Sequence, residues 1–104
     1  MAKAATNNNW GLSLFDSEDW EGAKDKFQEA IQAELASLDQ KSDSSDLAFY
    51  YNNLGLCFYH LARPQDEDQD IMKQAIRNYN AAIDANNQNP IHFFNRGNVH
   101  LNLQ

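Results

Sequence analysis

A short pattern, Asn two residues before Gly, occurs three times in this 104-residue chain, at Gly11, Gly55 and Gly97. Two of these glycines are followed by the same series of small and aromatic residues. The series after Gly11 is Ala23, Phe27 and Ala30, and the series after Gly55 is Ala75, Tyr79 and Ala82. In both series the aromatic residue stands 4 positions after the first Ala and 3 before the second. Such a repeat predicts a supersecondary unit that buries its apolar face only by stacking against a neighbouring copy.

The periodicity within each unit is helical. From Trp20 to Leu38 the apolar residues recur three or four positions apart, which is the spacing of one helix face. Asp16 or Ser17 precedes this helix and is its expected N-cap. Because prolines and glycines are few, an all-α fold of about five helices is predicted. The other four helices are expected over Lys3 to Phe15, from about Asp46 to Ala62, from the acidic stretch 66–70 to about Asn86, and from Pro90 towards the end.

These elements predict a single domain that covers residues 1–104. Polar segments without periodicity separate the helices, and they account for the extra residues of the second unit. The expected organisation is a first repeat at about 4–38, a loop at about 39–46, a second repeat at about 47–89 with an inserted loop at 63–70, and half of a third repeat at about 90–104.

This pattern resembles the tetratricopeptide repeat, a unit of two antiparallel helices. The residues of the second unit that match its signature are Tyr51, Leu54, Gly55, Phe58, Ala75, Tyr79 and Ala82. The resemblance implies helix pairs stacked in a right-handed α-solenoid. Gly11 and Gly55 are then expected to face Ala23 and Ala75 where the paired helices touch, with Phe27 and Tyr79 filling the space beside them. The departures from the signature are Trp10 for Leu in the first unit, Leu35 and Asn87 for the closing Pro, and Arg96 and His100 in the third unit.

The resemblance also implies a peptide-binding groove, lined by the first helices of successive repeats. Its residues would be Asn8, Asn9, Leu12 and Phe15 in the first unit, Phe49, Asn52, Asn53, Leu56 and Tyr59 in the second, and Ile91, Phe94, Asn95, Asn98 and Leu101 in the third. Asn9, Asn53 and Asn95 stand at the same position of each unit. Stacking would align them as a ladder whose amides grip the backbone of an extended partner. The alternative is that Asn, with thirteen copies in the chain, simply occupies solvated helix faces.

The family's other use is to clamp the C-terminal dicarboxylate tail of a chaperone. The positions where that clamp needs cations hold Asn8, Ile91 and Asn95, and Leu12 replaces a required Asn. Only Asn53 matches. Because a carboxylate would lack charge-assisted partners here, the expected partner is a neutral, apolar or mildly basic protein segment.

Composition argues against several other classes of function. The net charge of -7 disfavours binding to nucleic acid or to anionic membrane surfaces. The single Cys57 excludes an internal disulfide and is expected in the core. The start of the chain lacks the apolar stretch of a signal peptide, so a cytoplasmic protein is expected.

No pattern of an enzyme or a metal site is found. His60, His92 and His100 lack neighbours at metal-ligand spacing, and the aspartates at 66, 68 and 70 lack the Gly and Glu of a calcium loop. No nucleophile triad or phosphate-binding loop occurs. We therefore expect no cofactor and no catalysis.

Three interpretations of the chain remain open. It is a peptide-binding scaffold, a structural repeat that packs edge to edge in a larger assembly, or a substrate-recruiting part of a multidomain enzyme. The last helix, from Pro90 to Gln104, either caps the array or belongs to a longer one. The apolar residues Phe93, Phe94, Val99, Leu101 and Leu103 favour a fragment of a longer array, which would self-associate through this C-terminal helix.

Overall fold

The computed structural model describes residues 3–37, 45–62, 69–85 and 96. The helices within these residues are α1 (Lys3–Asp16), α2 (Trp20–Ser37), α3 (Ser45–Leu61) and α4 (Asp70–Ala85), with no strand. The all-α prediction is confirmed for this part of the chain, and the helices lie where the periodicity predicted them. The fifth predicted helix, from Pro90, lies outside the described residues except for Arg96, whose backbone is helical.

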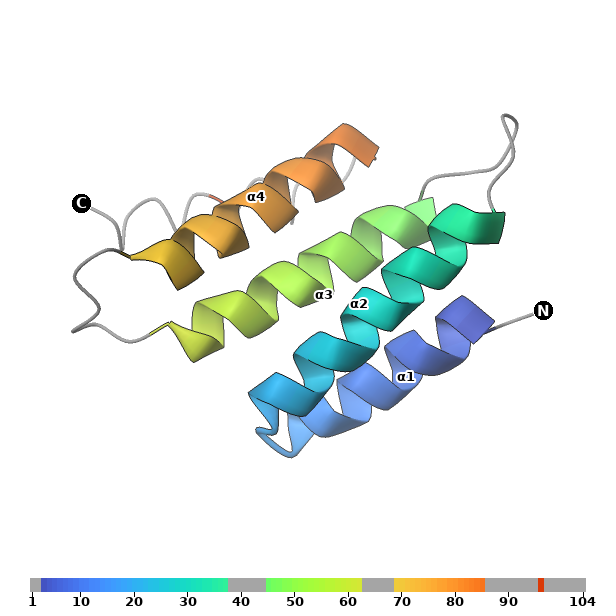
Figure 1. Cartoon of the computed structure of the whole chain (residues 1–104), viewed down its shortest axis with the longest axis horizontal. Helices are drawn as coiled ribbons and strands as arrows, with labels where there is room; N and C mark the ends of the chain where they lie inside the picture. The colour runs from blue at the N-terminus through green and yellow to red at the C-terminus, as the bar shows by residue number, and fades with distance from the viewer. Residues whose placement is uncertain (1–2, 38–44, 63–68, 86–95, 97–104) are drawn as a thin grey trace.

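Consecutive helices run antiparallel and lie side by side (Figure 1). Helix α1 packs against α2, α2 against α3, and α3 against α4. The described chain is therefore two helical hairpins, α1–α2 and α3–α4, joined through α2 and α3. Arg96 lies against the second hairpin, since its Nη1 donates a hydrogen bond to Oδ1 of Asn80 on α4, at 3.0 Å.

The two hairpins bury equivalent residues on their second helices. The exposed fractions are 0, 0, 0 and 6% for Ala23, Phe27, Ala30 and Ile31 of α2, and 0, 1, 0 and 9% for Ala75, Tyr79, Ala82 and Ile83 of α4. The spacing of these residues is the same in both helices. The sequence repeat is therefore also a repeat of packing.

An aromatic ring lies directly on the glycine of each hairpin's first helix. A Cβ atom added to Gly11 would lie 2.6 Å from Cε1 of Phe27, and one added to Gly55 would lie 2.6 Å from Cε1 of Tyr79. Carbon atoms in contact lie about 3.5–4.0 Å apart, so no side chain fits at either glycine without movement. The atoms nearest to each glycine thus belong to the aromatic ring that was predicted to lie beside the Gly–Ala contact. The ring itself fills the space that the missing side chain leaves.

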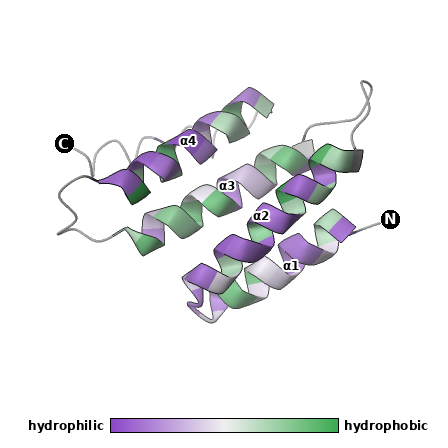
Figure 2. Cartoon of the chain, in the orientation of Figure 1, coloured by the Kyte–Doolittle hydropathy of each residue, from purple (hydrophilic) through white to green (hydrophobic). Residues whose placement is uncertain are grey.

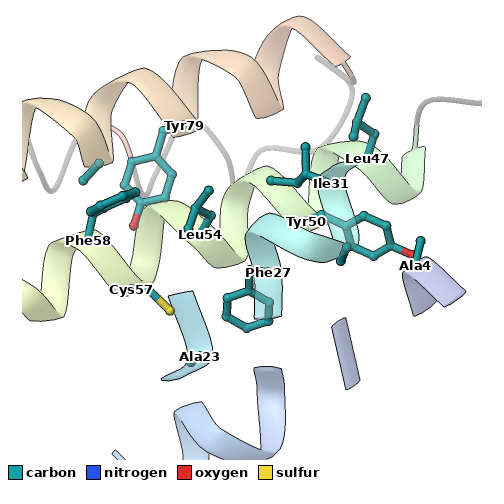
Figure 3. Packing of buried hydrophobic residues seen from close by; sticks show 12 residues of the cluster. Ala4, Ala23, Phe27, Ile31, Leu47, Tyr50, Leu54, Cys57, Phe58 and Tyr79 are labelled. Carbon is teal, nitrogen blue, oxygen red and sulfur yellow. The ribbon is translucent and has the colours of Figure 1, made fainter. Parts of the chain in front are cut away.

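One hydrophobic core extends through both hairpins (Figure 3). Tyr79 reaches from α4 towards α3, the sulfur of Cys57 on α3 points towards Ala23 of α2, and the hydroxyl end of Tyr50 lies beside Ala4 of α1. Cys57 is fully buried, as predicted. Helix α3 has a neighbour on each side and is coloured largely in hydrophobic shades, whereas α4 shows many hydrophilic residues (Figure 2). Because the cluster takes residues from all four helices, the hairpins form one packed unit.

The outer side of α1 is an exposed edge of this unit. Trp10 and Leu54 each precede the contact glycine of their helix, yet Trp10 is 53% exposed and Leu54 only 5%. Among the described helices, α3 packs extensively against both α2 and α4, whereas the extensive packing of α1 is against α2. Nζ of Lys26 lies 3.8 Å from the centroid of the Trp10 ring. An amphipathic Trp under a cation suits such an edge better than the Leu of the repeat signature.

The turn between α1 and α2 closes with a Schellman motif. The N–H of Asp19 donates to the carbonyl of Leu14, and the N–H of Glu18 donates to that of Phe15, both at 2.9 Å. Oδ1 of Asp19 then accepts from the N–H of Gly22 at 3.0 Å, so Asp19 is the N-cap of α2. The prediction of Asp16 or Ser17 as the cap is wrong, because Asp16 still belongs to α1 and the intervening residues form the turn.

We expect Gly11→Ala and Gly55→Ala each to lower the free energy of unfolding by about 1–3 kcal/mol, because the new methyl group must displace a buried ring. Urea denaturation would measure the loss. In a double-mutant cycle, Phe27→Leu should relieve part of the cost of Gly11→Ala, because the smaller side chain leaves room. A cost below about 0.5 kcal/mol for both alanines would contradict the ring-on-glycine contact.

We expect Glu18→Gly to stabilise the protein by about 0.5–1 kcal/mol. Glu18 has a φ of 64°, in the left-handed region where a Cβ atom is unfavourable. Ser17→Gly, one residue earlier at negative φ, is the matched control and should give no gain in urea denaturation. Equal effects of the two substitutions would show that strain at Glu18 is not the cause.

Candidate peptide-binding groove

The first helices of the two hairpins, α1 and α3, carry the described part of the predicted groove. The residues concerned are Asn8, Asn9, Leu12 and Phe15 on α1, and Phe49, Asn52, Asn53, Leu56 and Tyr59 on α3. None of these side chains is charged. The third-unit residues Ile91, Phe94, Asn95, Asn98 and Leu101 lie outside the described residues.

A small pocket of about 30 Å³ opens between α1 and α3. Its walls are Leu12, Phe15, Phe27, Asn53 and Leu56. Four of these five residues belong to the predicted groove, so the fold brings together side chains that are far apart in the sequence. The fifth, Phe27 of α2, is fully buried and closes the pocket on the inner side. The sequence pattern assigned Phe27 to the core alone, because periodicity does not show that one face of a buried ring can border a pocket.

An amide pair links the two hairpins at this pocket. Nδ2 of Asn53 donates a hydrogen bond to Oδ1 of Asn8, at 2.9 Å, and both residues are half-buried. The predicted ladder aligned Asn53 with Asn9, which is exposed. The bond that the structure describes instead joins Asn53 to the residue before Asn9. The three-residue ladder stays a prediction, since Asn95 lies outside the described residues.

The remaining groove residues differ in how much surface they offer. Leu12 and Phe49 are 39 and 44% exposed, and Phe15, Leu56 and Tyr59 are half-buried. Asn52 is only 6% exposed, so its side chain belongs mainly to the interior. The accessible described residues of the predicted groove are thus apolar, apart from the amides of Asn8, Asn9 and Asn53.

An aromatic cluster lies at one end of the predicted groove. The rings of Trp20 and His60 stack with centroids 4.4 Å apart and planes 13° from parallel. Phe15 meets both edge-on, at 4.8 Å from Trp20 and 5.3 Å from His60, and Tyr59 meets His60 at 5.8 Å. The cluster joins the end of α1, the start of α2 and the end of α3. The sequence indicated His60 only as a residue near the groove end. No local pattern signals its stacking on Trp20.

Ionisable side chains in the core are held in their neutral forms. Burial raises the pKa of the Cys57 thiol from 9.0 to about 12, against a smaller opposing effect of Lys24. Burial is also the main cause of the raised pKa of Tyr79 and of Tyr50, with Tyr59 and Asp46 respectively adding to it. A thiol with this pKa is protonated at neutral pH and is a poor nucleophile.

The described residues also show no sign of a metal site or of a membrane-spanning helix. They contain no group of three or more His, Cys, Asp or Glu side chains placed to hold a metal ion. Within these same segments, no helix combines the length and apolarity needed to cross a bilayer.

Comparison with known proteins identifies no relative of this chain. No protein-family model matches it, and no curated protein or solved structure shows significant similarity to it.

We expect the free energy of unfolding to fall as the pH rises from 9.0 to about 12. In this window the native Cys57 thiol keeps its proton while the unfolded thiol loses it, so the native state binds more protons. The stabilisation that the buried thiol contributes is therefore fully present below the pKa of the thiol in the unfolded chain, and it is lost as the pH approaches the pKa in the folded chain. Urea denaturation across this range would measure the decline.

The matched variant is Cys57→Ala, whose free energy of unfolding should decline less steeply with pH because the buried thiol no longer contributes. Identical slopes for the wild type and Cys57→Ala would contradict a protonated, buried thiol.

Proposed function

We propose that this chain is a tetratricopeptide-like protein-interaction module. Its hairpins would continue the stacking of α2 on α3 into a right-handed α-solenoid. The repeated packing of Phe27 on Gly11 and of Tyr79 on Gly55 supports this architecture. The hydrogen bond from Arg96 to α4 supports a third unit that stacks on the second hairpin.

The ligand that we propose is an extended segment of another protein, bound between α1 and α3. The observation that carries this proposal is the pocket that Leu12, Phe15, Asn53 and Leu56 form with Phe27. An apolar pocket with a few placed polar groups is the usual form of a recognition site. Amides that face the solvent beside it can hydrogen-bond to a peptide backbone without reading its sequence.

The absence of charge among the groove side chains favours a neutral, apolar or mildly basic partner. A carboxylate ligand would find no cation among the described groove residues. We propose that the module acts by binding and positioning its partner and performs no catalysis itself.

Selection from a random peptide library displayed on phage tests this function. We expect the selection to enrich peptides that bind the wild type. Their affinity for the Leu12→Gln variant should be lower by about tenfold or more, because burial of a Leu side chain contributes about 1.5–3 kcal/mol. Leu35→Gln is the matched control, since Leu35 is an exposed leucine on α2, 49% exposed, outside the groove. Asn53→Ala should also weaken binding while the fold survives. Enriched peptides that are insensitive to Leu12→Gln and Asn53→Ala would place binding elsewhere and refute the proposal.

A further inference from the structure

We infer that the pocket between α1 and α3 binds the side chain of a valine on an extended partner segment and rejects larger side chains. The inference rests on the proposed function and specifies which residue of the partner the groove selects. It follows from the size, the polarity and the rigidity of the pocket.

The size of the pocket restricts what can enter. One ordered water needs at least about 10–15 Å³, whereas a dry engineered cavity of about 150 Å³ accommodates benzene. The pocket of about 30 Å³ is therefore larger than one water needs and far too small for an aromatic ring. It accommodates one or two methyl groups.

The polarity of the pocket favours methyl groups over water. Four of the five walls are apolar, and Asn53 is the only polar side chain among them. A buried water typically needs two to four polar partners. A water here is poorly held, and its displacement by an apolar group is favourable.

The walls are held by contacts that do not involve the ligand. The ring of Phe27 is fixed against Gly11, with no room for even a Cβ atom between them. Phe15 is held edge-on by Trp20 and His60, and Asn53 by its hydrogen bond to Asn8. Because these three walls cannot move apart easily, a larger side chain is rejected instead of accommodated.

The amide pair completes the recognition of the segment. The bond to Asn8 uses one of the two N–H donors of Asn53, so Oδ1 of Asn53 can still accept a hydrogen bond and Nδ2 of Asn8 can still donate one. A peptide unit next to the bound side chain has one N–H and one C=O, which is the complementary set. The pair thus suits an extended backbone that passes over the pocket.

The test uses four probes, acetyl-Gly-X-Gly-amide with X as Ala, Val, Leu or Phe. Methyl and side-chain amide resonances of the full chain would be followed by NMR during titration. We expect the Val probe to shift the methyl groups of Leu12 and Leu56 and the amides of Asn8 and Asn53, and to bind at least tenfold more tightly than the Phe probe. The Ala probe should be weaker than Val, because it leaves part of the pocket empty.

Variants that enlarge the pocket provide the second arm. Leu56→Ala should move the preference from the Val probe to the Leu probe. Leu12→Ala should have the same effect, and because Leu12 is more exposed, this variant serves as the test if Leu56→Ala does not fold. Leu35→Ala is the matched control and should keep the preference for Val.

The possible failures are distinguishable. Equal affinity for all four probes, or an unchanged preference in the enlarged variants, would overturn the size selection and leave the proposed groove intact. No shift of groove resonances with any probe, together with no groove-dependent peptide from the phage selection, would overturn the proposed function as well.

Discussion

The contact of an aromatic ring with a glycine on the facing helix determines the geometry of both hairpins. Phe27 lies on Gly11 and Tyr79 lies on Gly55, with the same close approach. Since neither glycine could carry a side chain without displacing the ring, this contact sets how near the two helices of a hairpin come. The neighbouring alanines, Ala23 and Ala75, are fully buried and permit the same approach.

The pocket between α1 and α3 depends on this contact through a single residue. Phe27 fills the space above Gly11 and also closes the pocket between α1 and α3. The core therefore supports the pocket directly. The amide pair of Asn8 and Asn53 and the stack of Trp20 on His60 then join the hairpins at two further points. These links connect the first hairpin with α3 beside the pocket.

Differences between equivalent positions show how the environment of each helix selects its residues. Leu54 is buried because α3 has a helix on both sides, whereas Trp10 is exposed at the edge and lies under the ammonium of Lys26. Burial likewise raises the pKa of Cys57 and keeps its thiol protonated at neutral pH, so this side chain contributes to packing. The two units therefore share the ring–glycine contact and differ in the residues around it.

The sequence alone determined the helices, the repeat and the buried stripe of each second helix, because these follow from the period of 3.6 residues and are encoded locally. It also indicated Leu12, Phe15, Asn53 and Leu56 as residues of one surface, through a resemblance to a known repeat. Only the tertiary structure decided that Asn53 bonds to Asn8, that Phe27 borders the pocket, that His60 stacks on Trp20 and that Asp19 caps α2. The cap depends on the path of one tight turn. The other three depend on the offset between helices distant in the chain, which is set by the side chains packed between them and has no signature in the spacing along either helix.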